Sequence, residues 1–174
     1  MTDTPSPLRI LHVMRAPVGG LFRHVLDLAG EQAQRGHFVG LVADRNATDS
    51  LTAEKLAAIA PQLRLGLSLI PMSRRPGLGD VAALRAVRRL ANTLDLDVLH
   101  GHGAKGGAYA RLARPFLAQR GRRVRVFYTP HGGSLHYRPG TAAGAVFSRL
   151  EGIMGRLTDG LIFESDFARQ AYAR

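Results

Sequence analysis

Two glycines near the start of the chain stand where an anion could bind. Gly19 and Gly20 end a loop, residues 15–20, that precedes a segment with helical periodicity. Glycine lets backbone N–H groups approach a ligand closely, and a helix N-terminus carries partial positive charge. A phosphate group is therefore a natural ligand. A tight strand-to-helix turn without a ligand is the alternative for an isolated Gly-Gly pair.

A second glycine-rich segment carries histidines and a lysine. Residues 101–106 (GHGAKG) match the G-x-G-x-x-G pattern of dinucleotide-binding loops, but no acidic residue that could hold a ribose hydroxyl follows until Glu151. We therefore favour a loop that holds a phosphate or sugar phosphate, with Lys105 as a point charge. We expect His100 and His102 to point in opposite directions along their strand. Because no carboxylate lies near them in sequence either, we predict no metal site.

His131 is the third candidate. It follows Thr129 and Pro130 and precedes Gly132, so it lies on a tight turn at the end of a predicted strand. An imidazole there could donate a hydrogen bond to a ligand in a cleft. His12 lies inside the first predicted strand, and we interpret it as structural.

Strands and helices alternate along the chain. Short apolar runs predict strands at residues 9–14, 38–43, 65–70, 97–100, 124–129 and 161–164. Helical periodicity predicts helices at residues 21–35, 51–60, 81–94, 108–119 and 142–157, and one after Ser165. Gly36 is placed to end the first helix, and Asp80 to cap the third. The pattern predicts a single α/β domain with a doubly wound parallel sheet, in which ligands bind at the carboxyl ends of the strands.

Composition limits the function further. The 174 residues include no Cys and carry a formal net charge of +11, with no Asp or Glu from residue 98 to 150. Such a field favours phosphates, anionic lipid or nucleic acid. Nucleic acid is not expected, because no recognisable helix-turn-helix, zinc-finger or RNA-recognition pattern is present. No signal-peptide pattern or apolar run of about 18 residues is present, so we expect a cytoplasmic protein.

Four stretches together resemble glycosyltransferase family four, the large group of retaining GT-B enzymes. They are residues 19–39, which include GGLFRHV and RGHFV, then 97–107 (DVLHGHGAKGG), 128–132 (YTPHG) and 159–165 (DGLIFES). The resemblance covers nearly the whole chain, and each motif alone is weak. The Lys-Gly-Gly and Thr-Pro-His-Gly-Gly forms are most similar to members that build bacterial exopolysaccharide, capsule or lipopolysaccharide.

The resemblance implies roles for particular residues. The family's Gly-Gly loop donates N–H groups to the distal phosphate of the donor, which falls on Gly19 and Gly20. Its Thr-x-His-Gly histidine lies near the transferred sugar, which makes His131 the expected catalytic residue, with Gly132 beside it as a donor contact. The acceptor side is expected to include Arg15, His102, Lys105 and Gly106.

The resemblance also implies partners: a nucleotide-sugar donor, a lipid-linked or saccharide acceptor, and a second domain with a Glu-x7-Glu motif. This sequence has no such motif, so we expect only the N-terminal half of a GT-B enzyme, with negligible transfer by itself. No metal or other cofactor is expected. Arg85, Arg88 and Arg89, or the cluster at residues 120–125, could hold the protein on an anionic inner membrane surface.

Two other classes remain as alternatives. One is another Rossmann-like nucleotide-sugar enzyme, such as an epimerase or reductase, although Tyr109 is followed four places later by Ala113 where a Tyr-x-x-x-Lys pair needs lysine. The other is a basic α/β module that binds nucleic acid or other anions, suggested by a pI near 11.4.

Overall fold

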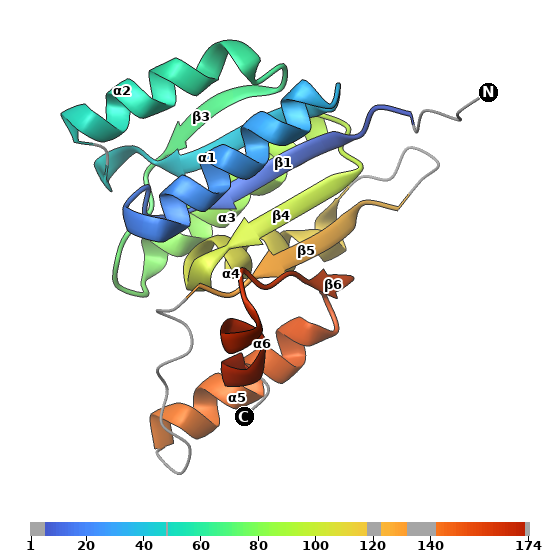
Figure 1. Ribbon diagram of the computed structural model, residues 1–174. Helices are drawn as coiled ribbons and strands as arrows, with labels where there is room; N and C mark the ends of the chain where they lie inside the picture. Colours follow the sequence, from blue (N-terminus) through green and yellow to red (C-terminus); the bar gives the residue numbers. More distant parts are fainter. Residues whose placement is uncertain (1–5, 48, 118–122, 132–141, 173–174) are drawn as a thin grey trace.

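Six parallel strands form one twisted sheet with helices on both faces (Figure 1). The computed structural model describes residues 6–47, 49–117, 123–131 and 142–172. The strands are β1 (Arg9–Met14), β2 (Phe38–Asp44), β3 (Gly66–Ile70), β4 (Val98–His102), β5 (Arg125–Thr129) and β6 (Gly160–Leu161). The helices are α1 (Gly19–Gln34), α2 (Ser50–Ile59), α3 (Leu78–Thr93), α4 (Gly103–Ala113), α5 (Ala142–Gly155) and α6 (Asp166–Tyr172).

The strand order confirms the predicted doubly wound sheet. It is β3-β2-β1-β4-β5-β6, so the chain builds one half outward from β1, then returns and builds the other half from β4. The order reverses between β1 and β4, and the carboxyl ends at such a switch point form the usual binding crevice of open α/β sheets. The helices that follow these two strands, α1 and α4, begin at this edge.

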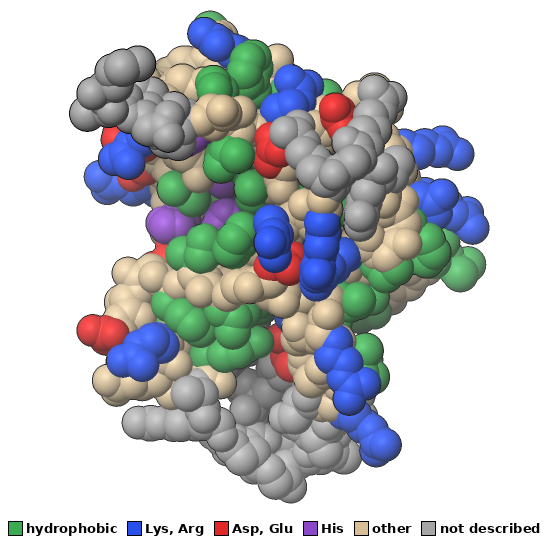
Figure 2. Space-filling view, turned by 90° about the vertical axis from the view of Figure 1, so that its right-hand side faces the viewer, with side chains coloured by type: hydrophobic (Ala, Val, Ile, Leu, Met, Phe, Trp, Pro, Cys, Tyr) green, Lys and Arg blue, Asp and Glu red, His purple; other side chains and the backbone are tan. Residues whose placement is uncertain are grey.

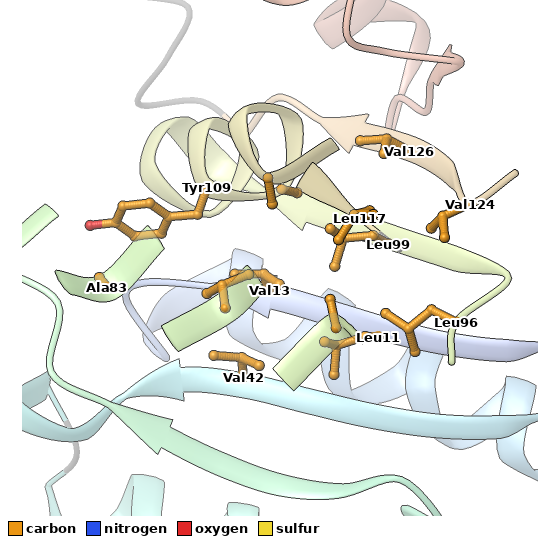
Figure 3. Close-up of a cluster of buried hydrophobic side chains, with 14 of the residues drawn as sticks. Leu11, Val13, Val42, Ala83, Leu96, Leu99, Tyr109, Leu117, Val124 and Val126 are labelled. Carbon is orange, nitrogen blue, oxygen red and sulfur yellow. The ribbon is translucent and has the colours of Figure 1, made fainter. Parts of the chain in front are cut away.

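Two hydrophobic clusters hold the layers together. On one face, Phe22 and Val25 of α1 pack with Leu56 of α2 over β1 and β2. On the other face, Val87 of α3 and Tyr109 of α4 pack over the opposite side of the same strands (Figure 3). Both faces of the central strands are buried, which explains why their sequences read as continuous apolar runs rather than as alternating ones.

The glycine-rich segment after β4 differs from the prediction. The sequence suggested a loop over residues 101–107, but β4 continues to His102 and α4 begins directly at Gly103. The physical reason is close packing of α4 on the sheet. A Cβ on Gly101 would lie 2.6 Å from the backbone oxygen of Gly106, and one on Gly106 would lie 2.3 Å from the backbone oxygen of Val13. These glycines allow close approach of helix and strands.

Several helix ends are also informative. Gly36 has φ of +89°, the left-handed conformation expected of the residue that ends α1. Asp80 is the third residue of α3 and not its N-cap as predicted; its carboxylate accepts the backbone N–H of Gly77 at 2.9 Å from inside the first turn. The α4 helix ends at Ala113, before a short 3-10 turn that contains Pro115, and is therefore shorter than predicted.

Candidate functional site at the carboxyl end of the sheet

The two N-terminal glycines form the first turn of α1. Gly19 has φ of +63°, and a side chain at Gly19 or Gly20 would meet no atom of the described residues within 4 Å. The N-cap residue, Val18, provides no side-chain hydrogen bond, and the first turn contains no acidic residue. The N–H groups and partial positive charge of this helix end are thus left for a ligand, and an anion fits them best.

His131 lies at the same edge, just after β5, and contacts a carboxylate. Its Nδ1 is 3.0 Å from Oε2 of Glu164, and the other oxygen of Glu164 is 3.8 Å from Nδ1 of His24. The rings of His24 and His131 have centroids 5.6 Å apart. His24 follows Gly20 by one turn of α1, so His131 lies beside the first turns of this helix. Burial lowers the pKa of His131, although Glu164 acts in the opposite direction.

Three further histidines lie beside this pair and are almost completely buried. His12 and His100 are paired in register on β1 and β4, and His102 follows two residues later. The expectation that His100 and His102 point in opposite directions is wrong, because residues two apart on a strand share a face. Their ring centroids are 4.0 Å apart. Burial lowers the pKa of His12 to about 4 and that of His102 well below its usual value, so both rings are neutral.

Lys105 lies on the opposite side of the α4 N-terminus from the histidines. Its ammonium group contacts Asp80 of α3 at 2.5 Å and donates to the backbone oxygen of Arg75 at 3.0 Å. Partial burial alone would raise the pKa of Asp80, but hydrogen bonds from Lys105 and Tyr109 have the larger combined effect. The pKa is therefore lowered, and the carboxylate stays ionised. Lys105 is therefore a paired cation and not the isolated point charge that the sequence suggested.

The other predicted contacts divide into two groups. Arg15 follows β1 and is half-buried at the carboxyl edge, close enough to influence the Tyr109 hydroxyl. Gly106 is buried against β1, with no surface for an acceptor to contact. Gly132 lies outside the described residues. Thus the structure brings Gly19, Gly20, His102 and His131 together, places Arg15 at the same edge, and uses Gly106 for packing.

The basic segment is less uniformly exposed than its sequence suggested. Arg111 is completely buried, stacks on Tyr128 at 3.9 Å from the ring centroid, and pairs with both oxygens of Glu151. The guanidinium of Arg123 lies 3.1 Å from Asp159. Figure 2 shows basic side chains spread over one face and interspersed with acidic and hydrophobic ones. The described basic side chains therefore do not form one continuous cationic surface on that face (Figure 2).

Sequence reasoning missed Glu164, His24 and Gln32. Glu164 and His24 contact each other and His131, and Oε1 of Gln32 accepts from Nε2 of His12 at 2.7 Å. Helical spacing gave one usable signal, because His24 and Gln32 fall eight residues apart on α1 and hence on one face. Nothing local marked Glu164, since its partner comes from a strand end 33 residues earlier.

Comparison with known proteins places these features in a family. The family model described as Glycosyltransferase Family 4 matches residues 18–174. A search of curated proteins found no match. The matched range includes the glycine pair, His100, His102, His131 and Glu164, but begins after His12.

Solved structures share the fold at low sequence identity. A glycosyltransferase from Rickettsia africae is 15% identical with a TM-score of 0.70, over 95% of this chain and 39% of that one. MurG from Acinetobacter baumannii is 16% identical with a TM-score of 0.56, over 90% of this chain and 42% of that one. A putative UDP-N-acetylglucosamine 2-epimerase from Listeria monocytogenes is 11% identical with a TM-score of 0.64, over 97% of this chain and 41% of that one.

These three chains are more than twice as long as the part matched, so this chain spans about two-fifths of their length. At such identities they establish a Rossmann-like fold of the type found in GT-B glycosyltransferases. The family model is the stronger finding, because it covers nine-tenths of the sequence and includes every motif at the carboxyl edge. The chain belongs to glycosyltransferase family 4.

Proposed function

We propose that this chain is the acceptor-side domain of a retaining glycosyltransferase. The enzyme would move a hexosyl residue from a nucleotide-sugar to a lipid-linked or polysaccharide acceptor of the cell envelope. The observation that carries this proposal is that His131 lies beside the first turns of α1 at the switch point of the sheet. A second domain, outside this sequence, would hold most of the nucleotide, so we expect negligible transfer by this chain alone.

The α1 N-terminus supports the donor half of the proposal. Gly19 and Gly20 would donate backbone N–H groups to the distal phosphate of the donor. During transfer the leaving diphosphate gains negative charge, and N–H dipoles already aimed at it stabilise the transition state without reorganisation. This electrostatic role requires no metal ion in this domain.

His131 would contact the transferred sugar. The contact of its Nδ1 with Glu164 fixes the ring orientation. Its Nε2 lies at the long distance of 3.5 Å from Nδ1 of His102 and would exchange that contact for a hydroxyl of a sugar bound beside α1. His24 supports a ligand at this place, since its Nε2 is buried and has no hydrogen-bond partner among the described residues. A hydroxyl of the donor sugar would satisfy that nitrogen.

The acceptor would enter from the neighbouring loops. Arg15 follows β1 and Lys105 lies on the first turns of α4, so both lie near the switch point. Because Lys105 is paired with Asp80, it would contribute a directed hydrogen bond more than a net charge. An acceptor carried on a polyprenyl diphosphate would be anionic, which suits Arg15.

A matched pair of glycine substitutions tests the phosphate site. Gly20 is the second residue of α1 and Gly79 the second residue of α3, and both are exposed. Aspartate in a first helical turn stabilises a helix through its dipole. In Gly20→Asp, however, the carboxylate would repel a diphosphate and compete for the same N–H groups. Gly79→Asp makes the same change in the first turn of α3, away from the N-terminus of α1.

The measurement is an NMR titration of the labelled chain with UDP and GDP. We expect shifts of the Gly19, Gly20 and Leu21 amides in the wild type and in Gly79→Asp, and at least a tenfold weaker response in Gly20→Asp. Shifts of equal size in Gly20→Asp, or wild-type shifts confined to another edge, would refute the assigned donor site.

A further inference from the structure

The three buried histidines at the centre of the sheet converge on one point. His12, His100 and His102 each offer one ring nitrogen, and these atoms all lie within 4.8 Å of one another. The Nδ1 of His12 and the Nε2 of His102 are 3.0 Å apart. Two imidazole nitrogens bound to one tetrahedral zinc ion, at about 2.0–2.1 Å each, stand roughly 3.3 Å apart. The geometry is thus close to that of a metal site.

The second nitrogen of each ring has its own partner. The Nε2 of His12 lies 2.7 Å from Oε1 of Gln32, and the Nε2 of His100 lies 2.9 Å from Oγ1 of Thr129. The Nδ1 of His102 lies 3.5 Å from Nε2 of His131. Metal-binding histidines characteristically use one nitrogen for the ion and donate the other N–H to such a partner, which fixes the tautomer.

The contacts of the three rings continue to His131 and Glu164. If Nε2–H of His12 donates to Gln32, its Nδ1 accepts a hydrogen bond from Nε2–H of His102. Without an ion, Nδ1 of His102 then accepts from Nε2–H of His131, and His131 donates to Glu164 only when its ring carries a second proton.

A cation between His12 and His102 gives a second arrangement that satisfies the same contacts. Both facing lone pairs then bind the ion, and His102 carries its proton on Nδ1 and donates it to His131. His131 in turn donates Nδ1–H to the Glu164 carboxylate. Every contact then joins one donor and one acceptor, and all the rings are neutral.

We propose that His12, His100 and His102 bind one divalent transition-metal ion, with Zn²⁺ as the best fit. Imidazole suits Zn²⁺, Co²⁺, Ni²⁺ and Cu²⁺, whereas Mg²⁺ and Ca²⁺ need oxygen ligands, which these side chains do not offer. Burial keeps the rings in the neutral form that binds metals. The site would join β1 to β4, and metal binding can be measured whether or not the proposed sugar transfer holds.

The ion has both a route to the site and a source of compensating charge. A hollow of about 420 Å³ beside the C-terminal half of α1 is lined by Gln32, His100, Phe127 and Ile162, among others, and so reaches the edge of the cluster. Water from this hollow could fill the fourth coordination position. The carboxylate of Glu164, linked to His102 through His131, partly offsets the charge of the ion.

The test is metal titration of the chelator-treated chain, purified without a histidine tag. We expect one equivalent of Zn²⁺ by calorimetry, visible absorption bands with Co²⁺, and no binding of Mg²⁺. His100→Gln and His102→Gln should lose the Co²⁺ bands. His37→Gln is the matched control, because His37 lies outside the cluster, where its Nδ1 accepts the backbone N–H of Leu8.

A variant outside the proposed coordination sphere covers the case in which the cluster variants fail to fold. Gln32→Ala removes the partner of His12 but no ligand, and we expect Zn²⁺ affinity to fall by about 10- to 100-fold. Absence of Zn²⁺ binding to the wild type, equal binding by His102→Gln, or unchanged affinity in Gln32→Ala would each overturn the proposal.

Discussion

At the residue scale, the main surprise is how a strongly basic chain uses its charges. Arg111 is among the largest fully buried side chains, although its sequence position suggested a solvated cation. It is stabilised by two hydrogen bonds to Glu151, at 2.8 and 3.0 Å, and by the Tyr128 ring. A buried charge persists only when it is paired, so Arg111 and Glu151 act as one unit that ties α4 to α5.

Removing Arg111 should therefore destabilise the fold strongly. We expect Arg111→Ala to lower the free energy of unfolding by about 3–5 kcal/mol, because Glu151, whose side chain is only 13% exposed, keeps its hydrogen bond from Tyr172 but loses the opposite charge. Urea denaturation measures the change. Arg85→Ala, on the exposed side of α3, is the control and should change stability by less than about 0.5 kcal/mol. Similar values for the two variants would show that the ion pair contributes little.

At the scale of elements, the contact between α4 and the central strands decides the shape of the switch point. The helix packs closely enough that a Cβ at Gly106 would overlap the backbone of Val13, and a Cβ at Gly107 would overlap the Tyr128 ring. This approach sets the position of the α4 N-terminus beside the first turn of α1, where a Cβ on Gly103 would lie 2.9 Å from Leu21. The glycines that resembled a nucleotide-binding loop thus position two helix ends.

Alanine substitutions can separate packing from helix propensity. Gly106→Ala should destabilise the protein by about 1–3 kcal/mol or more, because the new methyl group must displace backbone and not a flexible side chain. Gly152→Ala makes the same change in α5, where no atom lies within 4 Å. There we expect stabilisation of about 0.5–1 kcal/mol from helix propensity alone. Opposite signs in thermal unfolding would confirm the close contact; equal signs would contradict it.

At the scale of the whole molecule, charge and fold together suggest where the protein works. No helix in the described ranges has the length and apolarity needed to cross a bilayer. Arg85, Arg88 and Arg89 are nevertheless all exposed on α3, on the opposite side of the sheet from α1. A polyprenyl-linked acceptor would lie in a membrane surface, and these three arginines could rest on its anionic headgroups.

Vesicle sedimentation tests this membrane contact. Each near-surface charge contributes about 1 kcal/mol on anionic lipid, so replacing all three α3 arginines by glutamine should weaken binding roughly 100-fold at low salt. Replacing Arg23, Arg35 and Arg64 by glutamine removes the same net charge from exposed positions elsewhere. Equal losses in both triple variants would indicate attraction by net charge alone, and retention of the α3 variant on vesicles would exclude this surface.

The sequence by itself determined the local features of the fold. Five of the six strands, the helices between them and the left-handed Gly36 follow from periodicity and backbone preference, which depend on neighbouring residues. The sixth strand was predicted at residues 161–164, but β6 covers only Gly160–Leu161. The sites of Gly19, Gly20 and His131 at strand ends follow in the same way, since parallel strands share one carboxyl edge. Predictions from sequence that the structure corrected, such as the loop at residues 101–107, failed where a packing contact overrode the local pattern.

Only the tertiary structure decided which distant side chains meet. His12 joins His100 because β1 pairs with β4 in one particular register, and Glu164 reaches His131 because β6 lies next to β5. Arg111 and Glu151, 40 residues apart, follow the same rule. Strand order and register are set by the packing of the complete core, so no short stretch of sequence contains the information that brings these pairs together.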